Sequence, residues 1–404
     1  MDRFAALYTP IVFVAALLIV VSAPFLFGWS WYDAIYRALV LLVIACPRAL
    51  VISTSVTIVS GLAAATRMGI LVKGGSYLES AGKIKAMAFD KTGTITVGSP
   101  IMTDIVTLRG DERHALEYAL ALASGSDHPV SRAIAQGCRE RVNLAVPLPV
   151  EGLTAIPGLG MSGTIAGSDF VLANHRLIED RKQCSASLEE CLEGLERLGK
   201  TSVMLADDEG PIAVFAVADS IKKQSDGALV ALSGLGIHLV MLTGDNPHTA
   251  QAVAAQVGIS DIRANLLPEE KLQIIEELRG KFGVVAMVGD GINDAPALAR
   301  ADIGIAMGSA GSDTAIETAD IALMDDNPLL LFTLISLSRR TMTILHQNIF
   351  LALAIKAVFL CLAMAGYATL WMAVFADMGA SLMVVANGLR MLNQWNTNTN
   401  VKSK

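Results

Sequence analysis

Four long apolar stretches constrain the fold of this chain more than any other feature of its sequence. They cover residues 11–27, 35–55, 349–365 and 369–386. A helix rises about 1.5 Å per residue, so each stretch is long enough, or nearly so, to cross a hydrocarbon core of roughly 30 Å. A single stretch would be typical of a buried core helix. Four of them, arranged as two hairpins, favour a multi-pass membrane protein.

Charges beside these stretches predict how the chain is oriented. Residues 28–33, between the first two stretches, are aromatic and contain no Lys or Arg, and Arg37 is the one cation near them. The opposite ends carry Arg67, Lys73, Arg339, Arg340 and Arg390. By the positive-inside rule, this asymmetry places both termini and the large middle segment in the cytosol, under a plasma (inner) membrane.

The composition agrees with a membrane protein and argues against one class of partner. Hydrophobic residues make up 53% of the 404 residues and charged residues only 17%, which is more apolar than ordinary soluble domains. The net charge is −7 and no cluster of Lys and Arg forms a basic patch, so nucleic-acid binding is not expected. The cysteines lack CxxC spacing and are predicted to be reduced thiols: Cys46, Cys138, Cys184, Cys191 and Cys361.

The middle segment alternates β-branched runs with helical patterns, which predicts an α/β domain. Three runs are typical of buried parallel strands, each ending at a polar, Gly-containing turn: 85–89, 237–242 and 284–288. Because the carboxyl ends of parallel strands meet at one edge of a sheet, their polar residues are expected to form one site. More than a hundred residues separate the first two runs, so residues 100–217 are predicted to form an inserted domain.

Asp90 ends the first predicted strand and opens the sequence Asp-Lys-Thr-Gly-Thr. A carboxylate at a strand end can attack a phosphoryl group. The N–H groups of the turn that begins with Lys91 and Thr92 can hold the phosphoryl oxygens. The segment therefore predicts a phosphorylated aspartate.

Polar residues after the other two strands supply the remaining chemistry. Thr243, followed by Gly244 and Asp245, offers a hydroxyl donor, and Lys271 can neutralise charge that develops on the transferred phosphoryl group. The turn at 289–294 contributes two carboxylates, Asp290 and Asp294. Asp290 is the natural Mg²⁺ ligand beside Asp90, because Mg²⁺ prefers carboxylate and phosphate oxygens. Each piece alone is typical of an ordinary turn; all of them in this order favour a catalytic site.

In this combination the motifs resemble those of the P-type ATPases, members of the haloacid dehalogenase-like superfamily. Residues 90–94 resemble the phosphorylation motif of that family, 243–245 its second motif and 289–294 its hinge motif. The resemblance implies a multi-pass α-helical membrane domain and a cytoplasmic α/β haloacid dehalogenase-like (Rossmann-like) phosphorylation domain. An α+β nucleotide-binding domain is inserted into the latter.

The resemblance also assigns roles. It implies that ATP phosphorylates the enzyme and that the Asp90 carboxylate, the Thr92 main-chain carbonyl and Asp290 hold Mg²⁺. The candidate catalytic residues are Asp90, Lys91, Thr92, Thr243, Gly244, Asp245, Lys271 and Asp294. Phosphatases of the superfamily usually carry a second Asp two residues after the nucleophile. Thr92 stands at that position and cannot act as an acid or base near neutral pH, so the aspartyl phosphate is expected to persist.

Nucleotide-binding motifs of the heavy-metal branch are matched within the inserted domain. Ser-Asp-His-Pro contains His128, whose equivalent in that branch lies near the adenine ring, and Pro-Gly-Leu-Gly contains Gly158 and Gly160. These glycines let the backbone approach the nucleotide closely, and Asn174 occupies a matching position. The branch often has Glu five residues before its His; Ala123 stands there, which predicts reduced nucleotide affinity.

A transported-ion site is predicted in the apolar stretches. Cys46 precedes Pro47, which bends a helix and frees a carbonyl, so a nearby thiolate can meet a metal ion. Lys356 and Asp377 are charges within the third and fourth stretches, where charge is costly enough to imply a function. Their placement resembles the zinc/cadmium/lead-exporting subgroup. Cys46 and Asp377 would bind the ion, with Lys356 as counter-charge.

Arg48 departs from that subgroup, which has Cys-Pro-Cys where this chain reads Cys-Pro-Arg. A permanent cation replaces a soft anionic ligand. It would repel a metal ion and could pair with Asp377. The chain is therefore either a natural variant with altered selectivity or a variant impaired in transport.

The predicted order of domains ends with a polar tail. We expect a transmembrane hairpin at 1–75, the first part of the phosphorylation domain at 76–97 and the nucleotide-binding domain at 98–217. The second part of the phosphorylation domain is expected at 218–335, a second transmembrane hairpin at 336–392 and a disordered tail at 393–404. Relatives also carry an actuator domain with Thr-Gly-Glu, a sequence absent from this chain. The expectation is a fragment, a split protein or a truncated product, working with a separate or missing N-terminal portion.

Three functions follow from these observations. The leading hypothesis is ATP-driven export of Zn²⁺, Cd²⁺ or Pb²⁺ through an aspartyl phosphate, with a copper-type exporter as its alternative. A soluble-type phosphatase of the same superfamily is disfavoured by Thr92 and by the four apolar stretches. A non-transporting membrane remnant or regulatory protein is supported by Arg48 and by the missing Thr-Gly-Glu.

Overall fold

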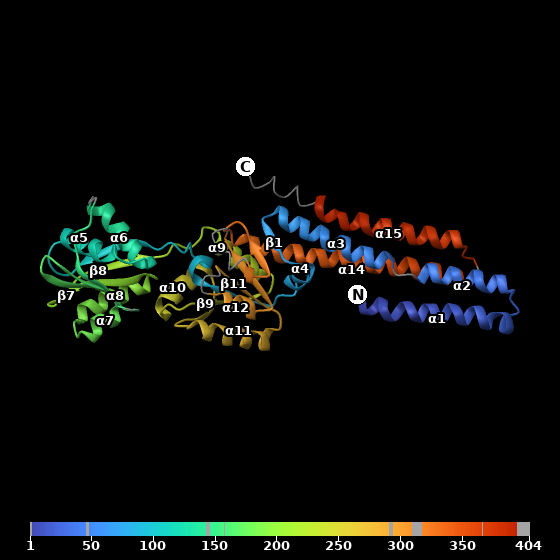
Figure 1. Ribbon diagram of the computed structural model, residues 1–404, viewed down its shortest axis with the longest axis horizontal. Coiled ribbons are helices and arrows are strands. Elements are labelled where there is room, and N and C mark those ends of the chain that lie inside the picture. The colour runs from blue at the N-terminus through green and yellow to red at the C-terminus, as the bar shows by residue number, and fades with distance from the viewer. Residues whose placement is uncertain are drawn as a thin grey trace. The chain divides into compact units, whose positions relative to one another are not determined.

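The computed structural model describes residues 2–45, 48–142, 146–156, 158–290, 294–308, 317–365 and 367–393. The chain divides into two compact units, one made of Met1–Lys83 with Thr333–Lys404 and the other of Ile84–Phe332. Long helices form the first unit, and two β-sheets with their helices form the second (Figure 1).

The first unit contains α1 (Asp2–Phe27), α2 (Trp31–Ala45), α3 (Arg48–Arg67), β1 (Ile70–Val72), α4 (Gly75–Ala81), most of α14 (Leu329–Met364) and α15 (Leu370–Asn393). Among the described residues, four stretches are long and apolar enough to cross a membrane: Pro10–Phe27, Trp31–Arg67, Leu329–Ala363 and Leu370–Leu392. Helix α14 thus begins well before residue 349, where the apolar stretch was expected to start. Of the predicted tail, Asn393 still belongs to α15, and the rest lies outside the described residues.

Small side chains let these helices approach one another. Helix α15 lies beside α3 and α2, and α1 packs on α2 (Figure 1). Ala49, Ala352 and Ala380 are fully or almost fully buried in one cluster with Leu50 and Val384. Between spanning helices, close van der Waals packing of small residues replaces the hydrophobic driving force that is absent in lipid.

The loop between α1 and α2 contains the contact partner of Arg37, the one cation near this end of the hairpin. The Arg37 guanidinium lies 4.1 Å from the centre of the Trp29 ring. The Ser30 hydroxyl accepts a hydrogen bond from the Asp33 N–H at 3.1 Å in the first turn of α2. Arg37 is therefore held by a cation–π contact, which offsets part of the cost of a charge beside an aromatic segment.

A parallel sheet forms the first half of the second unit. Its strands in spatial order are β13 (Ile321–Leu323), β12 (Ile303–Met307), β11 (Val285–Gly289), β2 (Ala86–Asp90), β9 (His238–Leu242) and β10 (Asp261–Arg263). Connecting segments include the turn η1 (Lys91–Ile95) and helices α9 (Ser225–Gly234), α10 (Pro247–Val257), α11 (Pro268–Phe282) and α12 (Ala295–Arg300). Strands β2, β11 and β12 are buried along their whole length, as their apolar, non-alternating sequences predict.

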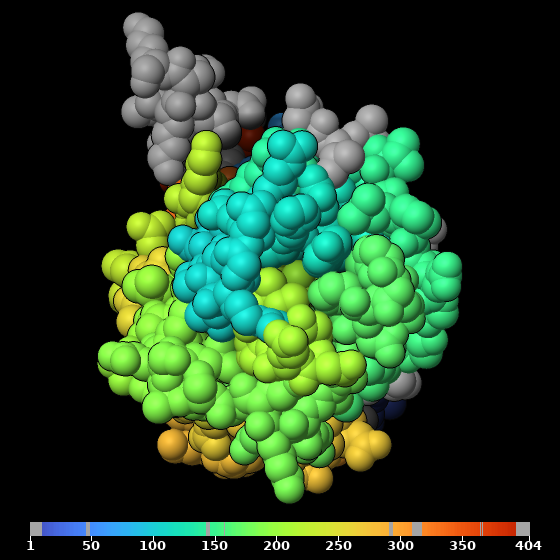
Figure 2. All heavy atoms as spheres, turned by 90° about the vertical axis from the view of Figure 1, so that its left-hand side faces the viewer, coloured from blue at the N-terminus to red at the C-terminus, as the bar shows by residue number. Residues whose placement is uncertain are grey.

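The second half is an antiparallel sheet formed within the segment that the sequence predicts as an insertion. Its order is β3 (Ile101–Thr107), β8 (Gly210–Ala218), β7 (Thr201–Asp207), β6 (Ser168–Ala173), β5 (Gly160–Ile165) and β4 (Glu151–Ile156). Four helices accompany it: α5 (Glu112–Ala123), α6 (Pro129–Val142), α7 (His175–Asp180) and α8 (Ala186–Arg197). In Figure 2 the face toward the viewer is formed largely by these cyan to yellow-green segments.

Alternating burial produces two cores in this antiparallel sheet. Leu172, Leu205 and Phe215 pack with α5 and α6, whereas their sequence neighbours Val171 and Met204 pack with the helices on the other side, α7 and α8. A strand presents successive side chains to opposite faces, so helices on both faces require apolar residues at both sets of positions.

Candidate active site

Asp90 is the last residue of β2, at the middle of the parallel sheet. Strand β2 pairs in parallel with β9 and β11, and Phe89 is in register with Met241 and Val288. The three strands therefore end at the same level. This register brings the turns after Asp90, Leu242 and Gly289 to one edge, as the sequence pattern predicts.

A lysine from α11 joins two carboxylates at this edge. The Lys271 Nζ lies 2.5 Å from Asp90 Oδ1 and 2.7 Å from Asp294 Oδ1. All three side chains are nearly buried, with exposed fractions of 11%, 11% and 2%. A buried lysine paired with two carboxylates is well placed to stabilise charge on a group bound at Asp90.

The electrostatics of Asp90 reveal an excess of negative charge. The pKa of Asp90 is raised to about 7: burial is the largest cause, Asp294 and Asp290 act in the same direction, and Lys271 opposes them. Burial lowers the pKa of Lys271, but Asp90 and Asp294 outweigh it and leave that pKa above its ordinary value. Lys271 is thus a fixed cation, and Asp90 titrates where a nearby positive charge would decide its state.

The turn after Asp90 depends on a glycine. Gly93 has φ +72°, a conformation that L side chains rarely adopt. A Cβ atom on Gly93 would lie 2.7 Å from Asp290 Oδ2, so the close approach of Asp290 to this turn requires a glycine. Thr92 adopts extended backbone angles beside it, φ −76° and ψ 130°.

Residues after β9 contact the same turn. The Thr243 hydroxyl donates to Asp245 Oδ2 at 3.0 Å and accepts from the Asp245 N–H at 3.1 Å. Asp245 Oδ2 also lies 2.5 Å from the Nζ of Lys91. Gly244 faces the Leu266 carbonyl, which a Cβ would approach to 3.3 Å. The second motif is therefore tied to the first by an ion pair between Lys91 and Asp245.

The oxygen donors predicted for Mg²⁺ fit such an ion. Asp90, Asp290 and Asp294 outnumber the single cation Lys271, and the resulting repulsion contributes to the raised pKa of Asp90. A hard divalent cation would remove that repulsion, and carboxylate oxygens are its preferred ligands. Asp90, the carbonyl of Thr92 and Asp290 come from adjoining turns at one edge.

Two residues after β8 belong to this region and are missing from the sequence prediction. The Nζ of Lys222 donates to the Gly93 carbonyl at 2.5 Å. The Asp219 carboxylate accepts from Thr96 Oγ1 at 2.5 Å and from the Gly98 N–H at 3.1 Å. Asp219 directly follows β8 and Lys222 comes four residues after that strand. Because β8 belongs to the antiparallel sheet, the rule applied to the ends of the parallel strands does not single them out.

The predicted nucleotide residues surround one cavity of about 320 Å³ in the antiparallel domain. His128, Gly158, Gly160 and Asn174 all line it, together with Ser126 and apolar residues. The amide of Asn174 donates to the Gly158 carbonyl at 3.0 Å, which ties two walls of the cavity together.

Gly160 allows this cavity to form. Its φ is +149°, and a Cβ would lie 2.2 Å from the Leu172 carbonyl oxygen, so no other residue fits without movement of the backbone.

Ala123, at the position where the branch often has Glu, is 1% exposed in the core of the domain.

The predicted ion site of the helical unit is only partly described. Lys356 on α14 and Asp377 on α15 face each other, with 3.7 Å between Nζ and Oδ1 and exposed fractions of 13% and 14%. Cys46 lies outside the described residues, and Arg48 begins α3. Lys356 is thus a cationic partner of Asp377.

A polar network lies on the same helices. The Asn348 amide donates to Thr57 Oγ1 and to the Val384 carbonyl, both at 3.2 Å, and its oxygen accepts from Asn387 Nδ2 at 2.7 Å. Thr57 and Asn387 belong to none of the motifs recognised in the sequence. Such bonds satisfy polar groups that would be costly in hydrocarbon.

Comparisons with known proteins agree with these features. A family model described as haloacid dehalogenase-like hydrolase matches residues 84–302. A probable cadmium-transporting ATPase of Alkalihalophilus pseudofirmus is 44% identical over 396 residues, which cover 97% of this chain and 55% of that relative. The zinc/cadmium/lead-transporting P-type ATPase of Escherichia coli K12 is 42% identical over 394 residues, covering 97% and 52%. A crystal structure of a zinc-transporting PIB-type ATPase in the E2.Pi state has a TM-score of 0.81 at 40% identity, covering 97% and 63%.

The chain belongs to the haloacid dehalogenase-like hydrolases, whose model matches more than half of it. Its similarity to the cadmium- and zinc-transporting ATPases confirms the resemblance to the heavy-metal branch of the P-type ATPases and the predicted fold class. The chain spans about half the length of the curated relatives it matches.

Proposed function

We propose that this chain carries out the ATP-consuming steps, and contributes to the ion-binding steps, of an ATP-driven exporter of divalent heavy-metal ions. The observation that carries the proposal is the nearly buried group in which the Lys271 ammonium contacts both Asp90 and Asp294 at the edge of the parallel sheet. It combines a nucleophile at a strand end with a fixed cation beside it.

In the proposed reaction a carboxylate oxygen of Asp90 attacks the terminal phosphorus of ATP. The bond from that phosphorus to the oxygen bridging to ADP breaks, and ADP leaves with the electron pair. Lys271 neutralises charge on the phosphoryl oxygens, and the Thr243 hydroxyl and the N–H groups of the turn at Lys91 orient them. Mg²⁺ supplies further neutralisation when held by Asp90, the Thr92 carbonyl and Asp290.

The cavity in the antiparallel domain is the proposed adenine site. Its size and its mostly apolar lining suit a purine ring, with the His128 imidazole as a stacking partner and Asn174 as a polar contact. Gly158 and Gly160 keep the backbone bare of side chains at one wall.

Zn²⁺, Cd²⁺ or Pb²⁺ is the proposed cargo, bound by Cys46 and Asp377. The ion pair between Lys356 and Asp377 favours this over a copper-type exporter, because a hard carboxylate is a poor ligand for Cu⁺. The names of two relatives, a cadmium-transporting ATPase and a zinc/cadmium/lead-transporting ATPase, support the same choice.

The proposed setting is a plasma (inner) membrane, with the four candidate spans in the bilayer and the sheets in the cytosol. Transport also needs a group that positions water for hydrolysis of the aspartyl phosphate. Thr-Gly-Glu occurs nowhere in these 404 residues, so we propose that an N-terminal portion with an actuator domain, separate from these residues or missing from them, completes the pump.

Labelling with γ-phosphate-labelled ATP tests the nucleophile. In the presence of Mg²⁺ the detergent-purified chain should acquire an acid-stable, hydroxylamine-labile adduct, because an acyl phosphate resists acid and reacts with hydroxylamine. Asp90→Asn should acquire none, while Asp208→Asn, an exposed aspartate in the antiparallel domain, should label as the parent does. Labelling of Asp90→Asn equal to that of the parent protein would contradict the proposal.

Turnover should be slow in this chain alone. Thr92 cannot serve as acid or base, and no actuator glutamate is present to activate water. The adduct should therefore decay slowly in a chase with unlabelled ATP, with little steady-state release of phosphate. Rapid multiple turnover would show that another hydrolytic group operates.

A further inference from the structure

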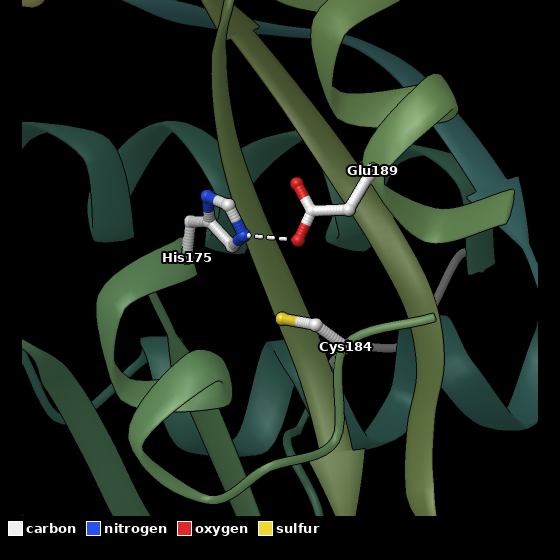
Figure 3. A group of neighbouring side chains, drawn as sticks. All are labelled: His175, Cys184 and Glu189. Atoms are coloured by element: carbon white, nitrogen blue, oxygen red, sulfur yellow. Dashed lines mark hydrogen bonds and ion pairs between the residues drawn. The ribbon is translucent and has the colours of Figure 1, made fainter. Parts of the chain in front are cut away.

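Three metal-ligating side chains converge in the antiparallel domain, in a place that the proposed reaction does not use. His175, Cys184 and Glu189 each offer one ligand atom, and these atoms all lie within 4.8 Å of one another. The His175 Nε2 is hydrogen-bonded to Glu189 Oε1 at 2.9 Å, and the Cys184 sulfur points into the same space (Figure 3).

Local structure holds two of these residues at helix starts. His175 is the first residue of α7, whose cap is Asn174; the Asn174 side chain accepts from the Leu177 N–H. Glu189 lies in the first turn of α8, which Ser185 caps by accepting from the Leu188 N–H. Because both helix starts are capped, the backbone at His175 and Glu189 keeps its position without help from a ligand.

Cys184 is carried by the short connection between these helices. Its neighbour Gln183 donates to the Asp207 carbonyl at 2.9 Å, which ties the connection to the end of β7. Lys182 adopts φ +58°, an unusual conformation for a residue with a side chain, and turns the chain just before the cysteine. The connection is therefore fixed in a course that brings the sulfur toward His175.

The group is accessible as well as pre-arranged. His175 and Glu189 have exposed fractions of 36% and 42%, and Cys184 is half-buried. An ordinary surface ion pair between histidine and glutamate needs no thiol beside it and contributes little to stability. Imidazole, thiolate and carboxylate together are the donor set that suits Zn²⁺ and similar divalent ions.

We propose that His175, Cys184 and Glu189 form a second metal site, which binds a divalent cation of the zinc class with water as its fourth ligand. A tetrahedral Zn²⁺ ion with bonds of about 2.0–2.3 Å sets its ligand atoms about 3.3–3.8 Å apart. The hydrogen bond between His175 and Glu189 must therefore open by roughly half an ångström, and the sulfur must draw closer by up to about 1.2 Å. Rotation of the side chains supplies such movements.

This site is separate from the proposed cargo site and adjoins the proposed nucleotide cavity. Asn174, which lines that cavity, directly precedes His175. A bound ion would join the start of α7 to the start of α8 and so fix the backbone at Asn174. The ion would stabilise the folded chain according to its concentration.

Binding of Co²⁺ to the full chain in detergent tests the proposal, because coordination of a thiolate to Co²⁺ gives a charge-transfer absorption. A Cys46→Ser background removes the thiol of the proposed cargo site. We expect one thiolate per bound ion in that background and displacement of Co²⁺ by Zn²⁺. Cys184→Ser should abolish the absorption, whereas Cys191→Ser should leave it intact, since Cys191 is a half-buried cysteine of the same core outside the group.

Two further variants separate ligation from a loss of folding. His175→Ala and Glu189→Gln should each weaken Co²⁺ binding by on the order of tenfold or more, with circular dichroism and thermal unfolding of the metal-free protein unchanged. The absence of a thiolate band in the Cys46→Ser chain, or its persistence in Cys184→Ser, would overturn the proposal. So would unchanged affinity in both His175→Ala and Glu189→Gln.

Discussion

The two groups of charged residues proposed to act in transport differ in their net charge. At the edge of the parallel sheet, Asp90 and Asp294 share the single ammonium of Lys271, and Asp290 adds a third carboxylate nearby. In the spans, one lysine on α14 faces one aspartate on α15 at 3.7 Å. The first group carries surplus negative charge and the second is neutral as a pair.

The difference follows from the surroundings of each group. A cytosolic site can hold excess carboxylates, because part of their repulsion is relieved by protonation, as the raised pKa of Asp90 shows. Charge inside a bilayer is costly, so an aspartate there is paired. The sheet-edge group thus favours the arrival of a cation directly, whereas an ion bound at the proposed cargo site would have to displace Lys356 from Asp377.

Among the changes that test this difference, removal of the Lys271 ammonium should have the largest effect, on the rate of phosphorylation. Lys271→Ala leaves Asp90 and Asp294 buried without their shared cation and removes the charge that faces the phosphoryl group. We expect the rate of phosphorylation by ATP to fall by roughly 10²–10³-fold, which is typical for loss of one electrostatic contact in a transition state. Rapid-quench labelling measures this rate.

Lys281→Ala is the matched control, since Lys281 lies on the same helix but outside the group. It should phosphorylate at the parent rate. A Lys271→Ala variant as fast as Lys281→Ala would remove Lys271 from the proposed reaction and would weaken the contrast between the two groups.

Arg48→Cys sharpens the membrane half of the comparison. Arg48 places a permanent cation two residues from Cys46, in addition to Lys356 beside Asp377. At a moderate effective dielectric this charge opposes a divalent ion by several kcal/mol, so the chain as it stands should retain little Zn²⁺ in the spans. Arg48→Cys adds a thiolate in place of the cation and should raise affinity about a hundredfold. Zn²⁺ content after equilibrium dialysis measures it.

The background for that measurement replaces the other thiols by serine: Cys138, Cys184, Cys191 and Cys361. Asp377→Ala combined with Arg48→Cys should remove the gain, because the carboxylate ligand is lost. If the parent already retains Zn²⁺ as tightly as Arg48→Cys, the electrostatic argument fails, and the Arg48 side chain must extend toward the membrane surface.

The pH dependence of stability gives the smallest effect. The folded state holds the Asp90 proton with a pKa of about 7, above the ordinary value of 3.8 for an aspartate. The contribution of this group to stability is therefore full below pH about 4 and is lost as the pH rises through about 7. In Mg²⁺-free buffer the free energy of unfolding, and with it the melting temperature, should therefore fall across that range.

Asp90→Asn should flatten this decline, because asparagine does not titrate, and millimolar Mg²⁺ should reduce it by favouring the ionised carboxylate. Thermal unfolding of both proteins at several pH values provides the comparison. An identical slope in Asp90→Asn would assign the pH dependence to another group.

Sequence patterns predicted where a residue lies when its place follows from the strand that precedes it and from the direction of that strand. Buried runs before Asp90 and before Thr243 indicated parallel strands, and parallel strands bring their carboxyl ends to one edge. The four apolar stretches likewise predicted the candidate spans, although their helical bounds differ because α14 is one continuous helix that begins at Leu329, well before residue 349.

Contacts between distant side chains were beyond such patterns. Lys271 precedes Asp294 by 23 residues and follows Asp90 by 181, and only the packing of α11 on the sheet brings its Nζ between them. The roles of Asp219 and Lys222 depend on the return of the chain from β8 to the turn after β2.

By itself, the sequence determined the class of the protein and predicted the nucleophile and the nucleotide residues, because motifs of contiguous residues fold into turns whose chemistry is local. Only the tertiary structure decided which charges share a partner and that His175, Cys184 and Glu189 meet. The cysteine spacing predicted no metal site, since these ligands come from two helix starts and the connection between them. Distances between such elements are set by how they pack on the sheet, and packing is a property of the whole domain.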